Sequence, residues 1–319
     1  MLSQLEPPLE SAADSSLLLR ALISGRRRDG RGVAASRPLA FSFARSDGRA
    51  SAEVVLGGAT RVHAAVTADL AVPHPDKPLE GFLAFHVEVL PSASRAAEFP
   101  AGGARAPFSA VHLSRVLERQ LRDARAIDTE ALCVVPGERV WALRCDVRVV
   151  EDGGNAVDAA SAAALAALLH FRRPDVTIRG RSVMVHGARE RAPLPLAVHH
   201  TPLTLSWGCL PCDARAAAGA GGDFADAEGA MLLRDPALAE ERLCDGSLTL
   251  CVNAHGELCG MHKLGGCSLP LPLVNAAVGA AAEASAAVCA QLRAALDAAE
   301  AAAAAAEVRA HAAAAAAFT

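Results

Sequence analysis

The stretch that decides the fold is WALRCDVRVVEDGGNAVDAASAAALAALLHFRRPDV, which runs from Trp141 to Val176. Its first nine residues alternate between apolar and polar side chains, and this period of two places one apolar row on a single face of a sheet. The glycines Gly153 and Gly154 then tolerate positive φ, and Asn155 is expected to act as the N-cap of a following helix. The stretch therefore predicts a half-buried strand, a short turn and a helix.

The predicted helix begins at Ala156 and ends near His170, before Pro174. Nearly all of its residues are alanine or leucine, and no charged residue follows Asp158 in it. Alanine and leucine are strong helix formers, and a helix without a polar face is usually covered on several sides. We therefore expect this helix to lie inside the protein.

A strand, a glycine turn and a helix can also form a phosphate site. The free N–H groups at the start of a helix attract anions, and glycines let the ligand come close. The simpler interpretation, which a glycine pair alone favours, is a tight turn without a ligand. These residues by themselves leave both interpretations open.

Four long blocks of the sequence, in one order and with few gaps, resemble a known family. They are RRRDGR from Arg26 to Arg31, AIDTEALCVVPGERVWALRCDVRVVEDGGNAVDAASAAALAALLHFRRPDV from Ala126 to Val176, LAVHHTPL from Leu196 to Leu203, and DPALAEERLCDGSLTLCVNAHGEL from Asp235 to Leu258. In these blocks the chain is similar to the RNase PH-like subunits of the RNA exosome. The resemblance implies an α+β fold of the RNase PH type (ribosomal protein S5 domain 2-like), with two βαβ-type subdomains that form one large unit. The basic run at the first block is expected to be structural.

The expected organisation has four parts, with the boundary between the two domains in the charged, proline-broken segment ARERAPLP. They are an N-terminal arm (1–25), a first RNase PH-like domain (26–190), a second RNase PH-like domain (191–300) and an alanine-rich low-complexity tail (301–319). We expect the tail to be poorly ordered, because a run of alanine cannot bury a specific face.

Composition limits the kinds of function that the chain can have. The formal net charge of −4 and the isoelectric point near 6.3 argue against a surface that binds nucleic acid everywhere, so any RNA contact must be focused. Nine scattered cysteines give no disulfide framework and suggest a reducing compartment. The pair Cys209 and Cys212 lacks the second pair of a zinc site, so we expect no metal or other cofactor. We also expect no membrane-spanning or targeting segment.

Phosphorolysis requires an inorganic phosphate beside the terminal RNA phosphodiester. Arginine or hydroxyl donors at the helix start would hold that phosphate. Active members of the resembling family have sequences such as Gly-Gly-Thr-Arg or Gly-Gly-Ser-Arg at this turn, whereas this chain has Gly153, Gly154, Asn155 and Ala156. Alanine cannot donate, and Asp158 adds a negative charge nearby. The turn is therefore interpreted as a degenerate phosphate site.

Active members of that family also carry two aspartates six residues apart in the second domain. The matching positions here are Asp235 and Glu241, so the acid pair is only partly kept. A glutamate could still bind a cation, but its longer arm would displace the ion. The alternative, which we favour, is that both residues belong to a polar loop without such a role.

Residues Val111 to Arg125 predict an amphipathic helix, with an apolar stripe opposite a face rich in arginine. The simpler interpretation of that face is that it is solvated. Its excess of arginine and the nearby Arg105 favour an RNA contact instead. In similar rings, a non-catalytic subunit lends arginines from the matching helix to RNA in its partner's pocket. The resemblance thus implies that Arg105, Arg115 and Arg119 contact the RNA backbone.

The function implied by the resemblance is that of a catalytically silent subunit of the exosome core ring. Such a subunit would help to form the channel through which RNA is threaded during 3′-to-5′ processing and degradation. Its expected partners are other RNase PH-like subunits in a hetero-hexameric ring, the cap subunits and single-stranded RNA, in the nucleus, nucleolus and cytoplasm. The alternative is an active phosphorolytic 3′-to-5′ exoribonuclease, which would release nucleoside diphosphates from RNA in phosphate buffer.

Overall fold

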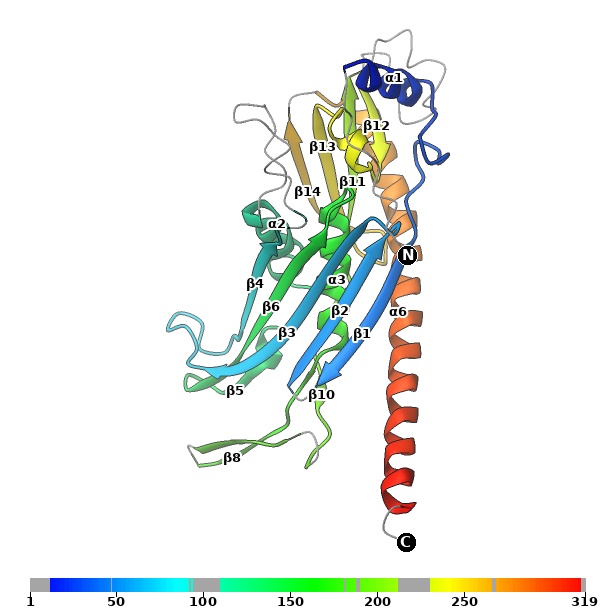
Figure 1. Ribbon diagram of the computed structural model, residues 1–319. Helices are drawn as coiled ribbons and strands as arrows, with labels where there is room; N and C mark the ends of the chain where they lie inside the picture. Colours follow the sequence, from blue (N-terminus) through cyan, green and yellow to red (C-terminus); the bar gives the residue numbers. More distant parts are fainter. Residues whose placement is uncertain are drawn as a thin grey trace.

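The computed structural model describes residues 12–46, 48–91, 93, 110–180, 182–187, 190–211, 230–265 and 268–316. Two sheets follow each other along the molecule, and one long helix runs beside both of them (Figure 1). The observed mixture of helices and strands has the predicted α+β character. The strand and the helix predicted from the stretch Trp141–Val176 lie at the centre of the fold, and the turn between them is the candidate site.

The first sheet contains six strands, in the order β1-β2-β3-β6-β4 with β5 paired to β6. Its strands are β1 (Leu39–Ser46), β2 (Arg49–Leu56), β3 (Thr60–Ala71), β4 (Phe82–Val89), β5 (Cys133–Val135) and β6 (Arg139–Glu151). All the pairs are antiparallel except β4 with β6, which is parallel. The long strand β6 confirms the alternating pattern after Trp141, because Leu143, Cys145, Val147 and Val149 are all buried.

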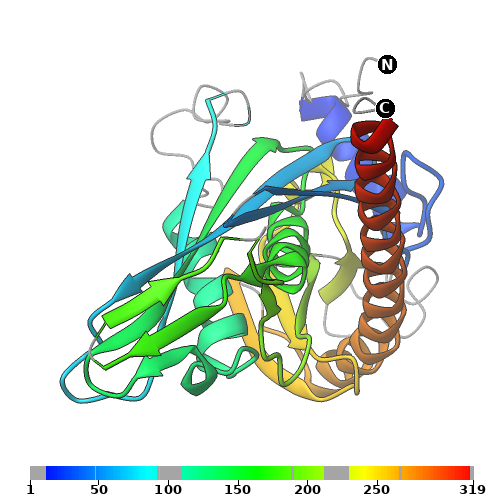
Figure 2. The ribbon, with the colours of Figure 1, turned by 90° about the horizontal axis from the view of Figure 1, so that it is seen from below.

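Helix α3 (Ala156–His170) has the bounds that the sequence predicted. It packs against β2 and β3 of the first sheet and against β11 of the second, and Figure 2 shows it enclosed between the two layers. Every residue of the helix is buried except Asp158 and Leu169. Small alanine side chains allow this close approach on several sides. The expectation of a covered helix is confirmed.

The second sheet has four antiparallel strands in the order β12-β11-β13-β14. They are β11 (Leu203–Pro211), β12 (Ala230–Arg234), β13 (Gly246–Val252) and β14 (Leu258–Gly265), with the short helix α5 (Leu238–Glu241) after β12. The main hydrophobic core includes Leu196 and Leu203 together with the first sheet and α3. The division of the chain at residue 190 stays a prediction.

Helix α6 (Leu271–Ala316) runs beside both sheets (Figure 1). Leu273, Ala277 and Ala281 pack on the second sheet, while Cys289 and Leu292 join the main core. Its stretch Leu271–Ala305 is long and apolar enough to cross a membrane, a property that alanine-rich core helices share. The helix continues through residues 301–316 of the alanine-rich tail, and the expectation that this tail is poorly ordered stays a prediction. Alanine has the highest helix propensity, which explains the continuation.

The remaining elements are short and lie around this framework. They are α1 (Ala12–Ile23), α2 (Ala110–Leu117), the π-helical turn η1 (Glu118–Asp123), the 3-10 turn η2 (Glu130–Leu132), β7 (Arg172–Arg173) paired with β10 (Leu194–Pro195), and the hairpin of β8 (Val176–Arg179) and β9 (Ser182–Val185). Helix α2 and the turn η1 together occupy the position of the predicted amphipathic helix.

Candidate phosphate site and arginine face

The turn between β6 and α3 is held tightly by neighbouring backbone. A Cβ atom on Gly153 would lie 2.5 Å from the Cβ of Ala59, and one on Gly154 would lie 2.5 Å from the backbone nitrogen of Leu238. Gly154 also has a φ of 101°, which favours glycine. The backbone N–H of Leu238 donates to the carbonyl of Gly153 at 2.9 Å. Both glycines are therefore needed for close packing of protein on protein.

The side chain of Thr60 closes the other side of this turn. Its Oγ1 accepts a hydrogen bond from the N–H of Gly153 at 3.1 Å and donates to the carbonyl of Gly154 at 2.6 Å. The threonine is completely buried. One hydroxyl thus satisfies two backbone groups that a glycine loop would otherwise direct to a ligand.

Asn155 does not cap α3 as expected. Its backbone is left-handed, with φ 56°, and its side chain forms no capping hydrogen bond. The Nδ2 group instead donates to Oδ1 of Asp235 at 2.8 Å and to Oδ2 of Asp158 at 2.9 Å. Asn155 therefore occupies the predicted N-cap position, but its side chain donates to the two carboxylates and does not accept from a backbone N–H of the helix.

A carboxylate of the chain itself occupies the position where an anion would meet this turn. Oε1 of Glu241, in α5, accepts a hydrogen bond from the backbone N–H of Asn155 at 2.6 Å. Negative charge is favourable at the start of a helix, and a carboxylate supplies it as a phosphate would. The following residue, Ala156, is 3% exposed and carries no donor side chain. The helix start is therefore already neutralised from within.

Asp235 is the most heavily hydrogen-bonded carboxylate of the region. It is 2% exposed and accepts from Arg37 through the backbone N at 2.7 Å, Nε at 3.0 Å and Nη2 at 2.8 Å. Nη1 of Arg31 donates to it at 2.9 Å. Burial alone would raise the pKa of Asp235, but the hydrogen bonds and charge of Arg37 lower it to about 2. The carboxylate is therefore ionised and fully engaged with protein donors.

The basic segment before the first strand holds these parts together. Arg37 also donates to the carbonyls of Gly153 and Gly154, at 3.2 and 3.0 Å. Arg27, whose side chain is completely buried, donates through Nε to Glu240 at 3.0 Å. This confirms a structural role for the basic run. Sequence reasoning missed Arg37 and Glu240, whose contacts join positions more than 100 residues apart.

Asp158 connects α3 to the second sheet. Its Oδ2 accepts from the backbone N–H of Ser206 at 2.9 Å, and its Oδ1 accepts from the Ser206 hydroxyl at 2.7 Å. Loss of water around this carboxyl raises its pKa to about 6, although the hydrogen bonds from Asn155 and Ser206 oppose the rise. The hydrogen bonds of Asp158 therefore join α3 to strand β11.

The two members of the acid pair engage different protein donors. Asp235 binds arginines from the N-terminal segment, whereas Glu241 binds the turn before α3. Within the described ranges, no group of three or more His, Cys, Asp and Glu side chains is arranged to hold a metal ion. The positions of Asp235 and Glu241 thus serve the packing of the turn.

The arginine face lies on α2 and η1. Arg115 and Arg119 are exposed, and the apolar side chains on the opposite face are buried, as the amphipathic pattern predicted. The buried side chains are those of Leu113, Val116, Leu117 and Leu121. Among the residues that the structure describes, neither guanidinium forms an ion pair, whereas Arg122 pairs with Glu118 and Asp123. Arg105 lies outside the described residues. A role of this face in RNA binding stays a prediction.

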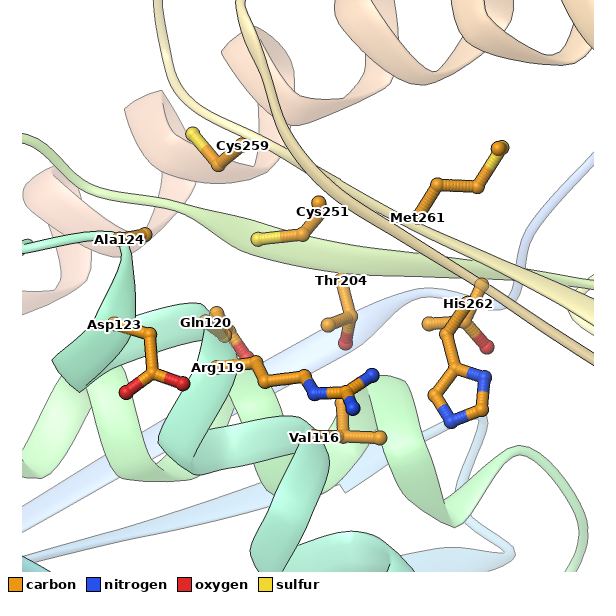
Figure 3. A pocket seen from close by; sticks show the side chains of 12 residues that line it. Val116, Arg119, Gln120, Asp123, Ala124, Thr204, Cys251, Cys259, Met261 and His262 are labelled. Atoms are coloured by element: carbon orange, nitrogen blue, oxygen red, sulfur yellow. The ribbon is translucent and has the colours of Figure 1, made fainter.

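A cavity of about 260 Å³ opens beside Arg119, between η1 and strands β13 and β14 (Figure 3). Gln120 lines it and is 2% exposed. Its Nε2 donates to Ser161 Oγ at 2.6 Å and to the carbonyl of Pro202 at 2.7 Å. Sequence reasoning missed this cavity, because its walls come together only through the packing of η1 on the second sheet.

Comparisons with known proteins agree with this architecture. The family model described as 3′ exoribonuclease family, domain 1 matches residues 35–174, and that of domain 2 matches residues 224–284. Exosome complex component RRP45A of Arabidopsis thaliana is 40% identical over 255 residues, which cover 79% of this chain and 76% of that protein. Exosome complex component RRP45 of Danio rerio is 40% identical over 259 residues, or 81% of this chain but 60% of that protein. The Schizosaccharomyces pombe protein rrp45 is 34% identical over 80% of each chain.

Solved structures show the same fold. An Archaeoglobus fulgidus exosome chain, from a structure with RNA bound to its active site, aligns with a TM-score of 0.69 and 24% identity. The alignment covers 87% of this chain and 96% of that one. Rice (Oryza sativa) Rrp46 aligns with a TM-score of 0.54 and 17% identity, over 85% of this chain and all of that one. From the two matched domains and the extent of identity, the chain belongs to the 3′ exoribonuclease family, among the RNase PH-like ring subunits of the exosome.

Proposed function

We propose that this chain is a catalytically silent subunit of the exosome core ring. It takes part in 3′-to-5′ RNA processing and degradation by forming part of the RNA channel and by holding partner subunits, in the nucleus, nucleolus and cytoplasm. The observation that carries the proposal is the hydrogen bond from the N–H of Asn155 to the carboxylate of Glu241. This contact occupies the anion position that phosphorolysis requires.

The surroundings of that contact also oppose phosphate binding. A phosphate at the turn would approach the negative charges of Glu241 and Asp235 in a region of low water content. The guanidinium of Arg37, which contacts the turn, directs Nε and Nη2 to Asp235, and Nη1 and Nη2 to backbone carbonyls. No donor side chain at Ala156 compensates for this. Binding of substrate phosphate would therefore cost free energy without new hydrogen bonds.

The proposed partners are RNase PH-like subunits of a hetero-hexameric ring, together with the cap subunits. Support comes from the names of the relatives, which are exosome complex components, and from the fold shared with exosome core structures. Single-stranded RNA is the proposed ligand of Arg115 and Arg119, which are exposed and positively charged. Guanidinium groups suit phosphate because they offer paired donors.

Catalytic silence is tested with the purified chain, alone and with a ring partner whose own active site has been inactivated. We expect no release of nucleoside diphosphates from single-stranded RNA in phosphate buffer, and none from an Ala156→Arg variant either, because Glu241 still occupies the turn. Phosphate-dependent release that is lost in Asp235→Asn, with an unchanged melting temperature, would support the alternative of an active phosphorolytic exoribonuclease.

RNA binding is tested by measuring the affinity of the assembled ring across a salt series. The Arg115→Ala/Arg119→Ala double variant should bind all single-stranded RNAs more weakly, since a phosphate contact carries no sequence information. Each lost contact should reduce the slope of log affinity against log salt by about 0.7. Arg122→Ala is the matched control, because Arg122 lies on the same turn but pairs with acidic side chains. Equal slopes for the wild type and the double variant would contradict the RNA contact.

A further inference from the structure

Two cysteines come together across strands β13 and β14. The register pairs Leu250 with Met261 and Cys251 with Gly260, and then continues with Val252 opposite Leu258. Cys259 is therefore the extra residue of a β-bulge next to Cys251. A bulge places two residues opposite one, so Cys259 and Gly260 both lie across from Cys251 on the neighbouring strand.

Both thiols are free and line the cavity beside Arg119 (Figure 3). Cys251 is 7% exposed, while Cys259 is partly exposed. Cys259 is therefore the more accessible of the two thiols. This is the arrangement of an accessible thiol with a protected neighbour.

The pKa values of the two thiols are shifted in opposite directions. A hydrogen bond from Cys251 lowers the pKa of Cys259 to about 6, with smaller contributions from His200 and the N–H of Asn253, while burial and Glu257 oppose the shift. The same hydrogen bond and burial raise the pKa of Cys251. Cys259 is thus the more readily ionised of the two thiols.

The spacing of the strands suits a covalent bond between these cysteines. Neighbouring strands lie about 4.8 Å apart, and disulfides most often join Cα atoms about 5.5 to 6 Å apart. Because Cys259 lies at the bulge opposite Cys251, the two cysteines are on neighbouring strands at adjacent register positions.

We propose that Cys251 and Cys259 form a peroxide-sensitive modification site. The Cys259 thiolate attacks one oxygen of hydrogen peroxide, the O–O bond breaks, and the released hydroxide takes a proton to become water. The resulting sulfenic acid on Cys259 is attacked by the sulfur of Cys251. An S–S bond forms, the S–O bond breaks, and the hydroxyl leaves with the proton of Cys251 as a second water.

The first test is peptide mapping by mass spectrometry of the full-length chain after exposure to a small excess of hydrogen peroxide. We expect a cross-linked pair of peptides joined through Cys251 and Cys259, which a reductant cleaves. In Cys251→Ala we expect Cys259 to proceed to sulfinic acid, because no neighbouring thiol traps the sulfenic acid. Equal sulfinic acid formation in wild type and variant, or cross-links only to Cys212 or Cys267, would overturn the proposal.

The second test is the pH dependence of alkylation by iodoacetamide, followed at each cysteine separately. The midpoint for Cys259 should lie near pH 6, whereas that of Cys133, a partly exposed thiol in β5, serves as the internal control. Cys251→Ala should raise the midpoint of Cys259, and Cys251→Ser should raise it less, because serine keeps a hydrogen-bond donor. A midpoint for Cys259 equal to that of Cys133 would show that the thiol pair does not exist in solution.

Discussion

The buried arginines near the turn have acidic partners, whereas the exposed Arg115 of α2 and Arg119 of η1 form no ion pair with the described residues. Arg37 donates to Asp235 and to two backbone carbonyls, and it is nearly enclosed. Arg119 is exposed, and among the described residues it has no ion-pair partner. The same side chain therefore stabilises the fold in one place and is available to a ligand in the other. Long-range partners, which composition does not reveal, decide between these uses.

Replacement of Arg37 should give the largest effect. Arg37→Ala leaves the buried carboxylate of Asp235 with fewer donors, and breaking a buried ion pair costs about 3 to 5 kcal/mol. The free energy of unfolding, measured by urea denaturation, should fall by that amount. Arg45→Ala, on an exposed position of β1, is the control and should change the free energy of unfolding by less than about 0.5 kcal/mol. Similar losses in both variants would remove the distinction between buried and exposed arginines.

The buried carboxyl of Asp158 should make stability depend on pH. Its pKa is about 6 in the folded chain, above the ordinary value of 3.8, so the folded state binds more protons between these values. The contribution of Asp158 to stability is therefore fully present below pH 4 and falls by about 3 kcal/mol as pH rises through 6. Asp158→Asn should lack this fall, while titrations elsewhere in the chain affect both proteins alike. Parallel stability curves for the two proteins between pH 4 and 7 would contradict the raised pKa.

Removal of Glu241 should expose the turn to anions. Glu241→Ala leaves the N–H of Asn155 without its acceptor, which should lower the free energy of unfolding by about 2 kcal/mol. Added phosphate should then raise the melting temperature of the variant and not that of the wild type, because ligands that bind only the folded state stabilise it. Glu241→Gln keeps an acceptor and should show a smaller loss. A phosphate response in the wild type would mean that the carboxylate does not block the turn.

The smallest effect on stability is expected from the exposed pair. Arg115→Ala/Arg119→Ala removes no ion pair seen in the described part of the chain and should change the free energy of unfolding by less than about 0.5 kcal/mol. Urea denaturation of this variant beside Arg37→Ala makes the comparison direct. A loss of several kcal/mol would show that the arginine face is part of the fold.

The sequence predicted the elements whose signals are local. The alternation after Trp141 and the alanine run from Ala156 to His170 specify β6 and α3, because side-chain period and propensity act over neighbouring residues. A local signal also marks the hairpin of β2 and β3, where two β-prone runs are joined by Gly57 and Gly58, both of which have positive φ. These features need no knowledge of distant segments.

The candidate site could be predicted only in part. Ala156 showed that a donor is missing, but nothing near it indicates that Glu241 supplies the negative charge. The contact of Arg37 with Asp235 joins positions 198 residues apart, and the pairing of Cys251 with Cys259 depends on a one-residue shift in register. Such contacts are set by tertiary packing, which local pattern and propensity do not encode.

The contact between Glu241 and the turn before α3 also limits which substitutions the chain can accept. A working anion site would require loss of the Glu241 carboxylate, a donor in place of Ala156, and another cation for Asp235 if Arg37 were to turn toward a ligand. Loss of the Glu241 carboxylate alone leaves an unsatisfied backbone N–H, and a larger side chain at Ala156 overpacks the helix start. Movement of Arg37 leaves the buried charge of Asp235 without this partner, and each of these changes destabilises the chain. Any single substitution toward a phosphorolytic site would therefore destabilise the fold, and only several substitutions together could create such a site.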